Sequence, residues 1–479
     1  TTDIDCIHRY KAALGHDRVF LLPFAAQPLV NNPVEKYERK DAFCFAGAYY
    51  VRYPERTRDL GNFIVNLPEF RPLEIYDRNY GKSDANYQFP EEYQPFVVGN
   101  LPYAEIDKAY KGYRYAINLN SIKQSQSMFA RRVYELLASN TITISNFSRG
   151  VRLMFGDLVV TSDSGAEIRR RLEAFGNDEA GARKFRLAAL RKVMLEHTYQ
   201  DRLAYVISKV SEETLPSLLP QIIVVAYAKD QAQADGLLRA FERQQYRAKT
   251  LVLVVPEQFD PAGVPDGRAV RVLSALESDT VMLQALASPA AWLSVMVADD
   301  YYGAHYLTDL ALATRYAQAP AIGKVAQYVW SGSKGLSLLR DDAAYTFVTE
   351  IAARSGIARF DTLPAVSLRD WVRELYTAQF NHASCFAVDE FNYCRSGVAL
   401  DEAGRSTVDD VLLSDHGLTL DEMQRRAEAV AAERLDSNAL PQLRGSDLAS
   451  LLTKAPANSR VSMVERGGCL QVDSALPDG

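Results

Sequence analysis

The chain has 479 residues, of which 48% are hydrophobic and 24% are charged, and its formal net charge is −6. These are the values of an ordinary soluble globular protein that is long enough for two or three domains. The weak charge, without a basic tail or interleaved arginine and aromatic residues, argues against a nucleic-acid binder. Apolar runs such as QIIVVAYA (221–228) are far shorter than the roughly 20 residues that span a bilayer.

The first part of the chain, residues 1–212, is predicted to alternate strands and helices. The expected strands are FCFAGAYY (43–50), PLEIYD (72–77), PFVVGN (95–100), YAINLN (115–120), TITISN (141–146) and DLVVT (157–161). Between them lie RTRDLGNFIVNL, YAEIDKAYKG, SMFARRVYELLAS and SGAEIRRRLEAF, which read as helices. Ser164 with Glu167 is typical of a capping box, and residues 178–210 are expected to form one or two helices. This alternation predicts an α/β domain with a parallel sheet that is covered on both faces.

A second unit, residues 213–398, opens in the same β-α-β manner. QIIVVAYA is followed by the helix QADGLLRAFERQQY and the strand TLVLVV, and RAVRVL (268–273) and WLSVMVA (292–298) are further strands. Residues 399–479 are expected to form a small extension that is polar and helical at first. Its last segment could form a hairpin around Gly467 and Gly468.

The five cysteines, Cys6, Cys44, Cys385, Cys394 and Cys469, are scattered. No pair has the spacing of a zinc site or a disulfide framework, so a reduced, cytoplasmic setting is expected. No signal peptide is visible at the start of the sequence. The oligomeric state is left open.

The most informative segment is RRVYELLASNTITISN (131–146), a short helix that runs into a buried strand. Glu135 lies midway along the helix, where its carboxylate could accept hydrogen bonds from a sugar or ribose diol at the edge of the sheet. The alternative is a plain helical ion pair with Arg131, four residues earlier.

Two further strand ends are candidates for ligand binding. Gly47 ends the strand FCFAGAYY and Arg52 follows it, so a phosphate could approach the backbone and be neutralised. An ordinary strand-to-helix turn is the alternative. Asn100 and Tyr103, in GNLPYAEI, could bind a nucleobase or belong to a plain loop. Asn118 and Asn120 add two amides at a strand end, where doubly wound sheets bind their ligands.

In the second unit, Asp299 and Asp300 directly follow the strand WLSVMVA. Adjacent aspartates are suitable oxygen ligands for Mg²⁺ or Mn²⁺ bridging a diphosphate. Alternatively, Asp300 could cap the helix that runs through Tyr306. Asp370, in SLRDWV, is a possible general base or simply a solvated helix carboxylate. The histidines show no metal-ligand spacing.

Taken together, FAGAYYVRYPER, GNLPYAEIDKAYKGYRYAINLN and RRVYELLASNTITIS resemble, in order and spacing, the CgeB-type (spore-maturation) glycosyltransferases of the GT-B group. The resemblance covers roughly residues 1–200 and implies a Rossmann-like half that binds a nucleotide-sugar donor. By this resemblance Glu135 contacts the donor ribose, Gly47 is the glycine at the first strand end, and Arg132 faces the diphosphate. The family has glycine where this chain has Asn140. The first 26 residues resemble only the last part of the family's N-terminal half.

Residues 218–395 resemble, more loosely, the GT-A domain of the family-two glycosyltransferases. This resemblance makes Asp299 the metal-binding carboxylate with Asp300 beside it, and Asp370 the base. Val297 stands where the metal motif has its first aspartate, and Arg369 stands where the family has an acid before Asp370. An altered or catalytically idle GT-A fold is therefore expected.

The sequence thus predicts a cytoplasmic glycosyltransferase made of two α/β modules and a small C-terminal extension. The first module would bind a UDP- or GDP-linked sugar for transfer to a polysaccharide, glycan or protein. Two alternatives are an active, Mn²⁺- or Mg²⁺-dependent second module and a non-catalytic glycan-binding or scaffold protein.

Overall fold

The computed structural model describes residues 1–173, 175–176, 178–211, 215, 217–260, 264, 267, 269–412, 414–432, 460–466 and 469–475. Contacts divide the chain into two compact units. The larger holds residues 1–7 and 19–430, and the smaller holds residues 8–18 and 431–479. The smaller unit contains most of helix α1 (Ile7–Leu14) and an antiparallel hairpin of β19 (Arg460–Arg466) and β20 (Cys469–Ala475). The strands of the predicted hairpin are therefore confirmed, whereas its two glycines lie outside the described residues.

The first module of the larger unit is built on a six-stranded sheet in the order β3-β2-β1-β4-β5-β6. Every neighbouring pair is parallel. The strands are β1 (Lys40–Gly47), β2 (Leu73–Asp77), β3 (Val97–Gly99), β4 (Tyr113–Asn118), β5 (Ile142–Ser145) and β6 (Val160–Thr161). The chain runs outward from β1 to β3, then returns to the other side of β1 with β4. This is the doubly wound, Rossmann-like order, with its switch point between β1 and β4.

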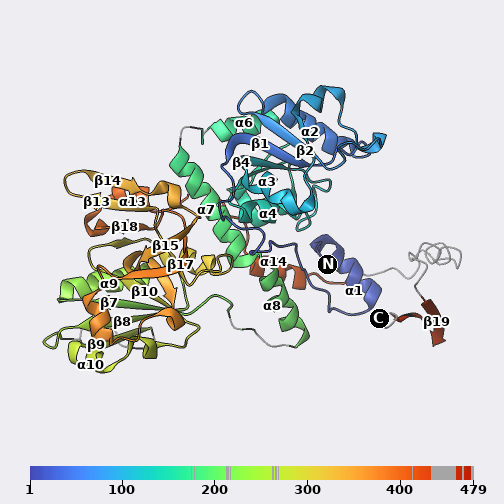
Figure 1. The fold of residues 1–479 in the computed structure, drawn as a ribbon. Helices are drawn as coiled ribbons and strands as arrows, with labels where there is room; N and C mark the ends of the chain where they lie inside the picture. The colour runs from blue at the N-terminus through green and yellow to red at the C-terminus, as the bar shows by residue number, and fades with distance from the viewer. Residues whose placement is uncertain are drawn as a thin grey trace. The chain divides into compact units, whose positions relative to one another are not determined.

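Helices cover both faces of this sheet (Figure 1). Because side chains alternate along a strand, Phe43 and Phe45 pack with α2 (Pro54–Asn66) and α6 (Gly165–Glu173). Cys44 and Ala46 face the other side, where α3 (Ile106–Lys111) and α4 (Arg132–Ala138) lie. The predicted parallel sheet covered on both faces is thus present.

Three more helices complete this part of the chain: α5 (Arg149–Phe155), α7 (Glu179–Glu196) and α8 (Tyr199–Val210). The segment 178–210 therefore forms two helices. The second half of α7, including Val193 and Met194, belongs to one continuous core that also includes Val133 of α4 and Val224 of the second sheet. Helix α7 consequently shares its core with both modules.

The second module is built on an eight-stranded mixed sheet in the order β15-β17-β12-β16-β10-β7-β8-β9. Its strands are β7 (Ile222–Tyr227), β8 (Lys249–Val255), β9 (Val270–Ser274), β10 (Trp292–Met296), β12 (Ala321–Gly323), β15 (Phe347–Ala352), β16 (Gly356–Arg359) and β17 (Gln379–Ala387). Strands β10, β7, β8 and β9 are mutually parallel, and β16 joins β10 antiparallel. The helices of this module are α9 (Gln231–Arg243), α10 (Ala275–Thr280), α11 (Tyr306–Ala313) and α12 (Leu368–Arg373).

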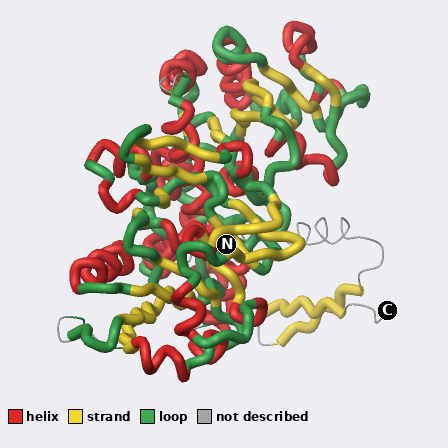
Figure 2. Tube along the Cα trace, turned by 60° about the vertical axis from the view of Figure 1, so that its left-hand side comes forward, coloured by secondary structure: helices red, strands yellow, loops and turns green. Residues whose placement is uncertain are grey.

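A smaller sheet and two late helices finish the larger unit. The sheet has the order β11-β18-β13-β14, with β11 (Tyr301–Tyr302), β13 (Gln327–Ser331), β14 (Gly335–Leu339) and β18 (Tyr393–Arg395). Helices α13 (Glu402–Val408) and α14 (Leu420–Glu428) bury Val408, Met423 and Ala427 in the same unit. Helices and strands both recur along nearly the whole described chain (Figure 2). Within the described part of the chain, no helix has both the length and the apolar content needed to cross a membrane.

Two local expectations differ from the structure. Asp300 does not cap a helix, because β11 follows it directly and α11 begins only at Tyr306, after His305. At α6, Ser164 Oγ accepts the N–H of Glu167 at 3.3 Å, but the Glu167 carboxylate pairs with Arg170 at 2.8 Å. Only one half of the predicted capping box is therefore seen, since Arg170 competes for the carboxylate.

Candidate nucleotide-sugar site

A cavity of about 780 Å³ opens at the carboxyl ends of the first sheet's strands, at the switch point between β1 and β4. Gly47, Tyr103, Arg132 and Glu135 all line it. Four of the five predicted donor-binding residues therefore come together from β1, the loop after β3, and α4. The fifth, Asn100, is exposed and is not among the lining residues.

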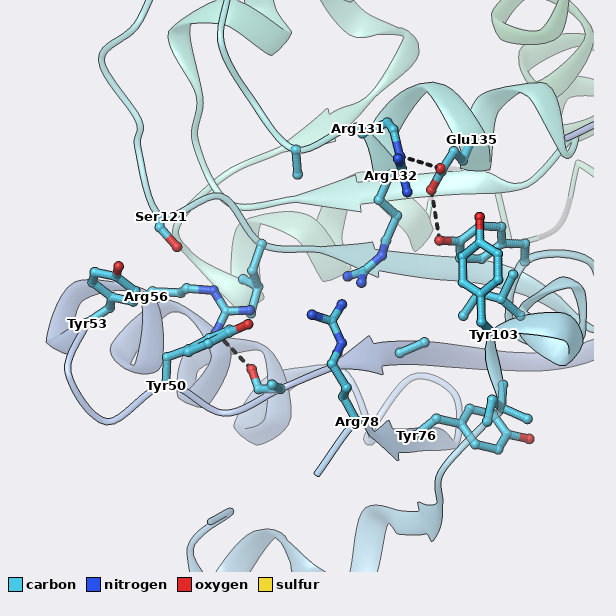
Figure 3. A pocket seen from close by; sticks show the side chains of 18 of the residues that line it. Tyr50, Tyr53, Arg56, Tyr76, Arg78, Tyr103, Ser121, Arg131, Arg132 and Glu135 are labelled. Carbon is cyan, nitrogen blue, oxygen red and sulfur yellow. Dashed lines mark hydrogen bonds and ion pairs between the residues drawn. The ribbon is translucent and has the colours of Figure 1, made fainter. Parts of the chain in front are cut away.

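The cavity is strongly basic, since it is lined by five arginines and a single carboxylate. The arginines are Arg52, Arg56, Arg78, Arg131 and Arg132. Figure 3 shows the guanidinium groups of Arg78 and Arg132 pointing toward each other across the cavity. Among the described residues, no carboxylate forms an ion pair with either of them. Two facing, unneutralised guanidinium groups favour an anion that bridges them.

Arg56 is held firmly on the first turn of α2. Its Nη1 donates to the carbonyl oxygen of Ala48 at 3.0 Å, and its guanidinium lies 4.7 Å from the ring centre of Tyr50. Burial, with smaller contributions from the charges of Arg132 and Arg78, lowers the pKa of Arg56 to about 10. The side chain therefore remains charged at neutral pH and adds to the positive potential of the cavity.

Glu135 is fixed by two partners. Tyr110 donates its hydroxyl to Oε2 at 2.9 Å, and Arg131 Nε lies 2.7 Å from Oε1 (Figure 3). The predicted ion pair with Arg131 is thus confirmed, and it coexists with a position in the cavity wall. Each carboxylate oxygen has two acceptor sites, so the held carboxylate can still accept hydrogen bonds from a diol.

Gly47 has a steric reason to be glycine that lies within the sheet itself. A Cβ atom built at this position would lie 2.6 Å from Cζ of the Phe45 ring. Close approach of a ligand is therefore not needed to explain the residue. The carbonyl oxygen of Gly47 accepts the N–H of Arg78 at 2.8 Å, which ties the ends of β1 and β2 together.

The asparagines at the end of β4 and just after it form a buried hydrogen-bond network beside the lining residues Leu119 and Ser121. Asn118 and Asn120 are buried, and both donate to Ser145 Oγ, at 3.1 and 3.0 Å. Asn146 accepts the N–H of Asn120 at 2.7 Å, and Asn120 Oδ1 accepts the N–H of Ala130 at 2.9 Å. This network fixes both ends of the loop 119–131, which carries Ser121 and Arg131 into the cavity wall.

In the second module, the two aspartates predicted to bind a metal have different surroundings. Asp300 is buried, and Arg354 Nε donates to its Oδ2 at 2.7 Å. The hydroxyl of Tyr393 and the N–H of Ser396 also donate to this carboxylate, at 2.8 and 2.7 Å. Asp299 is exposed beside it. A divalent cation does not fit here, because Arg354 already provides the positive charge for Asp300.

The described residues contain no group of three or more His, Cys, Asp or Glu side chains that could hold a metal ion. Asp370 lies in the exposed first turn of α12, where Ser367 Oγ donates to its Oδ2 at 2.9 Å and Arg373 approaches at 3.2 Å. These contacts are those of a solvated helix carboxylate, and Asp370 does not line the donor cavity.

Arg56 and Arg78 are the two lining arginines that sequence reasoning missed. Arg78 directly follows the predicted strand PLEIYD. Gly47 was selected because it ends a strand, and the same criterion identifies Arg78. Arg56 had no comparable signal, because it lies inside a helix and reaches the cavity through packing on Tyr50.

Fold and cavity together define an α/β protein with an arginine-lined pocket at a Rossmann-like switch point. Residues 68–208 match a protein family described as glycosyl transferase-like, so the chain contains a glycosyltransferase-like region. The match includes Arg78, Tyr103, Arg132 and Glu135 but begins after Gly47 and Arg56. It spans less than a third of the 479 residues.

Among solved structures, the chain matches the crystal structure of residues 1–349 of S. aureus TarS, with 11% sequence identity and a TM-score of 0.26. The match covers 36% of this chain and 60% of that chain. A TM-score this low gives no support to a shared overall fold. No curated protein matches the chain significantly.

Proposed function

We propose that the chain is a glycosyltransferase whose first module binds a nucleotide-sugar donor, UDP- or GDP-linked, in the arginine-rich cavity. The observation that carries the proposal is the pair of facing guanidinium groups, Arg78 and Arg132, without carboxylate partners in the described residues. A donor diphosphate carries the charge and the paired oxygens that such a pair binds. The match of residues 68–208 to a glycosyl transferase-like family supports the same class of reaction.

In the proposed reaction, the bond between the sugar's anomeric carbon and the diphosphate breaks as an acceptor hydroxyl oxygen bonds to that carbon. The diphosphate leaves with the electron pair, and the acceptor hydroxyl releases its proton to solvent water. Arg56, Arg78 and Arg132 would stabilise the charge that develops on the leaving diphosphate. Glu135, held by Tyr110 and Arg131, would accept hydrogen bonds from the ribose hydroxyls. The acceptor would be a polysaccharide, glycan or protein.

We further propose that the module pair corresponds to a CgeB-type GT-B half followed by a GT-A-like domain. The parallel strands β9-β8-β7-β10 joined by antiparallel β16 support the second part of this proposal. Because Arg354 neutralises Asp300, no step of the proposed transfer uses a metal in this domain.

Calorimetric titration with UDP and with GDP tests the donor assignment. Arg132→Ala removes a charge-assisted contact to the diphosphate and should weaken binding about 10- to 100-fold, and Glu135→Ala should also weaken it. Arg170→Ala is the control, because Arg170 is exposed and, within the described part of the chain, forms its ion pair with Glu167 alone. Circular dichroism checks that each variant is folded. Wild-type affinity in both site variants, or no nucleotide binding by the wild type, would contradict the proposal and favour a non-catalytic binding protein.

A further inference from the structure

The proposed donor cavity extends to both sides of the facing Arg78 and Arg132. Glu135 lies on one side of this pair in Figure 3. On the other side lie four side chains that the proposed nucleoside contacts do not use: Tyr50, Tyr53, Arg56 and Ser121. A nucleotide sugar has its diphosphate in the middle, between the nucleoside and the sugar. With the diphosphate on the arginine pair and the ribose on Glu135, as proposed above, these four side chains lie where the sugar would be.

Two arginines and two tyrosines are packed together on this sugar side of the cavity. The guanidinium group of Arg52 lies 4.9 Å from the ring centre of Tyr53, and that of Arg56 lies 4.7 Å from the ring centre of Tyr50. The centres of the two tyrosine rings are 6.0 Å apart. Because all four residues line the cavity, these contacts hold both cations at the same end of it.

Arg52 is accessible to a ligand and is not neutralised by the protein. The residue is exposed, and apart from its contact with the Tyr53 ring it forms neither a hydrogen bond nor an ion pair with any described residue. Stacking on Tyr53 limits the freedom of its long side chain. Arg52 therefore offers a complete, partly ordered guanidinium group at the cavity wall.

The positive charge of the cavity exceeds what a donor diphosphate can match. Glu135 is the only carboxylate among the described lining residues, and Arg131 neutralises it. The diphosphate of a nucleotide sugar carries about two negative charges, and about one more develops on its terminal phosphate when the bond to the sugar breaks. The three arginines already assigned to the leaving diphosphate match these charges. Arg52 is then left without an anion, and it lies on the side of the sugar.

We propose that the sugar of the donor is acidic, a hexuronic acid whose carboxylate binds Arg52, which makes Arg52 a specificity-determining residue. This inference rests on the proposed function, because the place of the sugar follows from the diphosphate and ribose contacts. A carboxylate fits the planar fork of a guanidinium group, which donates two parallel hydrogen bonds to it. One unmatched arginine also corresponds to one negative charge, which a carboxylate carries and a phosphate monoester exceeds.

Calorimetry on the whole chain compares pairs of donors that differ only in having a carboxylate or a hydroxymethyl group on the sugar ring. The pairs are UDP-glucuronate with UDP-glucose, UDP-galacturonate with UDP-galactose, and GDP-mannuronate with GDP-mannose. At least one acidic donor should bind about ten-fold more tightly than its neutral partner, through one charge-assisted contact. Arg52→Gln should remove this advantage, and Arg52→Lys, which keeps the charge and loses the fork, should retain part of it.

Arg58→Gln is the matched control, because Arg58 is also exposed, lies close by in sequence on α2 and does not line the cavity. It should keep the wild-type preference for the acidic donor. The inference is overturned, and the proposed function stands, if UDP or GDP binds but no acidic donor binds more tightly than its neutral partner, or if Arg52→Gln keeps the preference. If neither UDP nor GDP binds, the proposed function fails and this inference fails with it.

Discussion

At the scale of single residues, the proposed donor cavity brings together arginine side chains whose charges repel one another. Arg78 is exposed at the end of β2 and faces Arg132 of α4. Like charges at short range are unfavourable in the empty site and become favourable when an anion lies between them. If the proposed donor binds here, the arrangement favours the liganded state at some cost to the stability of the unliganded protein.

Arg78→Ala should accordingly separate affinity from stability. We expect nucleotide affinity to fall about ten-fold through loss of one charge-assisted contact. The free energy of unfolding without ligand should stay the same or rise slightly, because one repulsion is removed. Calorimetry and urea denaturation measure the two quantities. A variant that loses stability and keeps its affinity would show that Arg78 is structural.

Asp299 and Asp300 are neighbours in sequence but should differ sharply on substitution. Arg354→Met leaves the buried Asp300 carboxylate without its cation and should lower the free energy of unfolding by about 3 kcal/mol. Asp299→Ala changes an exposed side chain and should alter it by less than about 0.5 kcal/mol. Urea denaturation compares the two. Equal effects, or stabilisation of the wild type by Mn²⁺ that Asp299→Ala abolishes, would restore the metal assignment.

At the scale of elements, the loop 119–131 forms part of the cavity wall, although it contains neither a helix nor a strand. Asn120 holds both ends of this loop through Ser145, Asn146 and Ala130. Asn120→Ala should therefore loosen the loop and weaken nucleotide binding, while the sheet beneath stays intact. Hydrogen exchange should become faster in residues 121–130 and unchanged in β1. Uniformly faster exchange would instead indicate a general loss of stability.

The six strands of the first sheet, four strands of the second (β7, β8, β9 and β10) and most helices could be predicted, because apolar runs and strand-end turn residues are local signals. The other four strands of the second sheet, β12, β15, β16 and β17, were not predicted. Gly47, Arg132 and Glu135 could also be brought to one edge, since parallel strands end on the same side of a sheet. The role of Asp300 could not, because its partner Arg354 is 54 residues away and nothing local marks the pairing. The role of Arg56 depends likewise on packing against Tyr50, which a helical pattern does not reveal.

At the scale of the whole molecule, α7 joins the modules through charge as well as through apolar packing. Arg191 lies 2.8 Å from Asp309 through its Nε and 2.5 Å from Asp410 through its Nη1, with all three side chains largely buried. Although burial acts in the opposite direction, the charge of Arg191 lowers the pKa of Asp410. The two modules are therefore joined by buried ion pairs as well as by a shared apolar core.

The stability of the whole molecule should depend on pH through His197. Burial, together with the charges of Arg202 and Lys192, lowers the pKa of this histidine well below its usual value. The unfolded chain takes up a proton near pH 6.5 and the folded chain does not, so acidification below that pH favours unfolding. Between pH 6.5 and 5 this should cost the wild type about 2 kcal/mol, and His197→Gln should not show that loss.

Denaturation at several pH values measures the difference between the two proteins. Burial raises the pKa of Asp389 to about 7, so Asp389 acts in the opposite direction, stabilising the fold as the pH falls from about 7 to 4. It is present in both proteins, and its effect cancels in the comparison. Parallel pH profiles would show that His197 is protonated in the folded state.

The packing of the Phe45 ring against Gly47 limits what this glycine can reveal about function in related sequences. Any side chain at position 47 would force the buried Phe45 ring to move, whether or not a donor binds. A relative that had lost its activity would still retain the glycine as long as it retained the phenylalanine. The presence of this glycine therefore does not by itself indicate donor binding, whereas under the proposed function the facing arginines at positions 78 and 132 do.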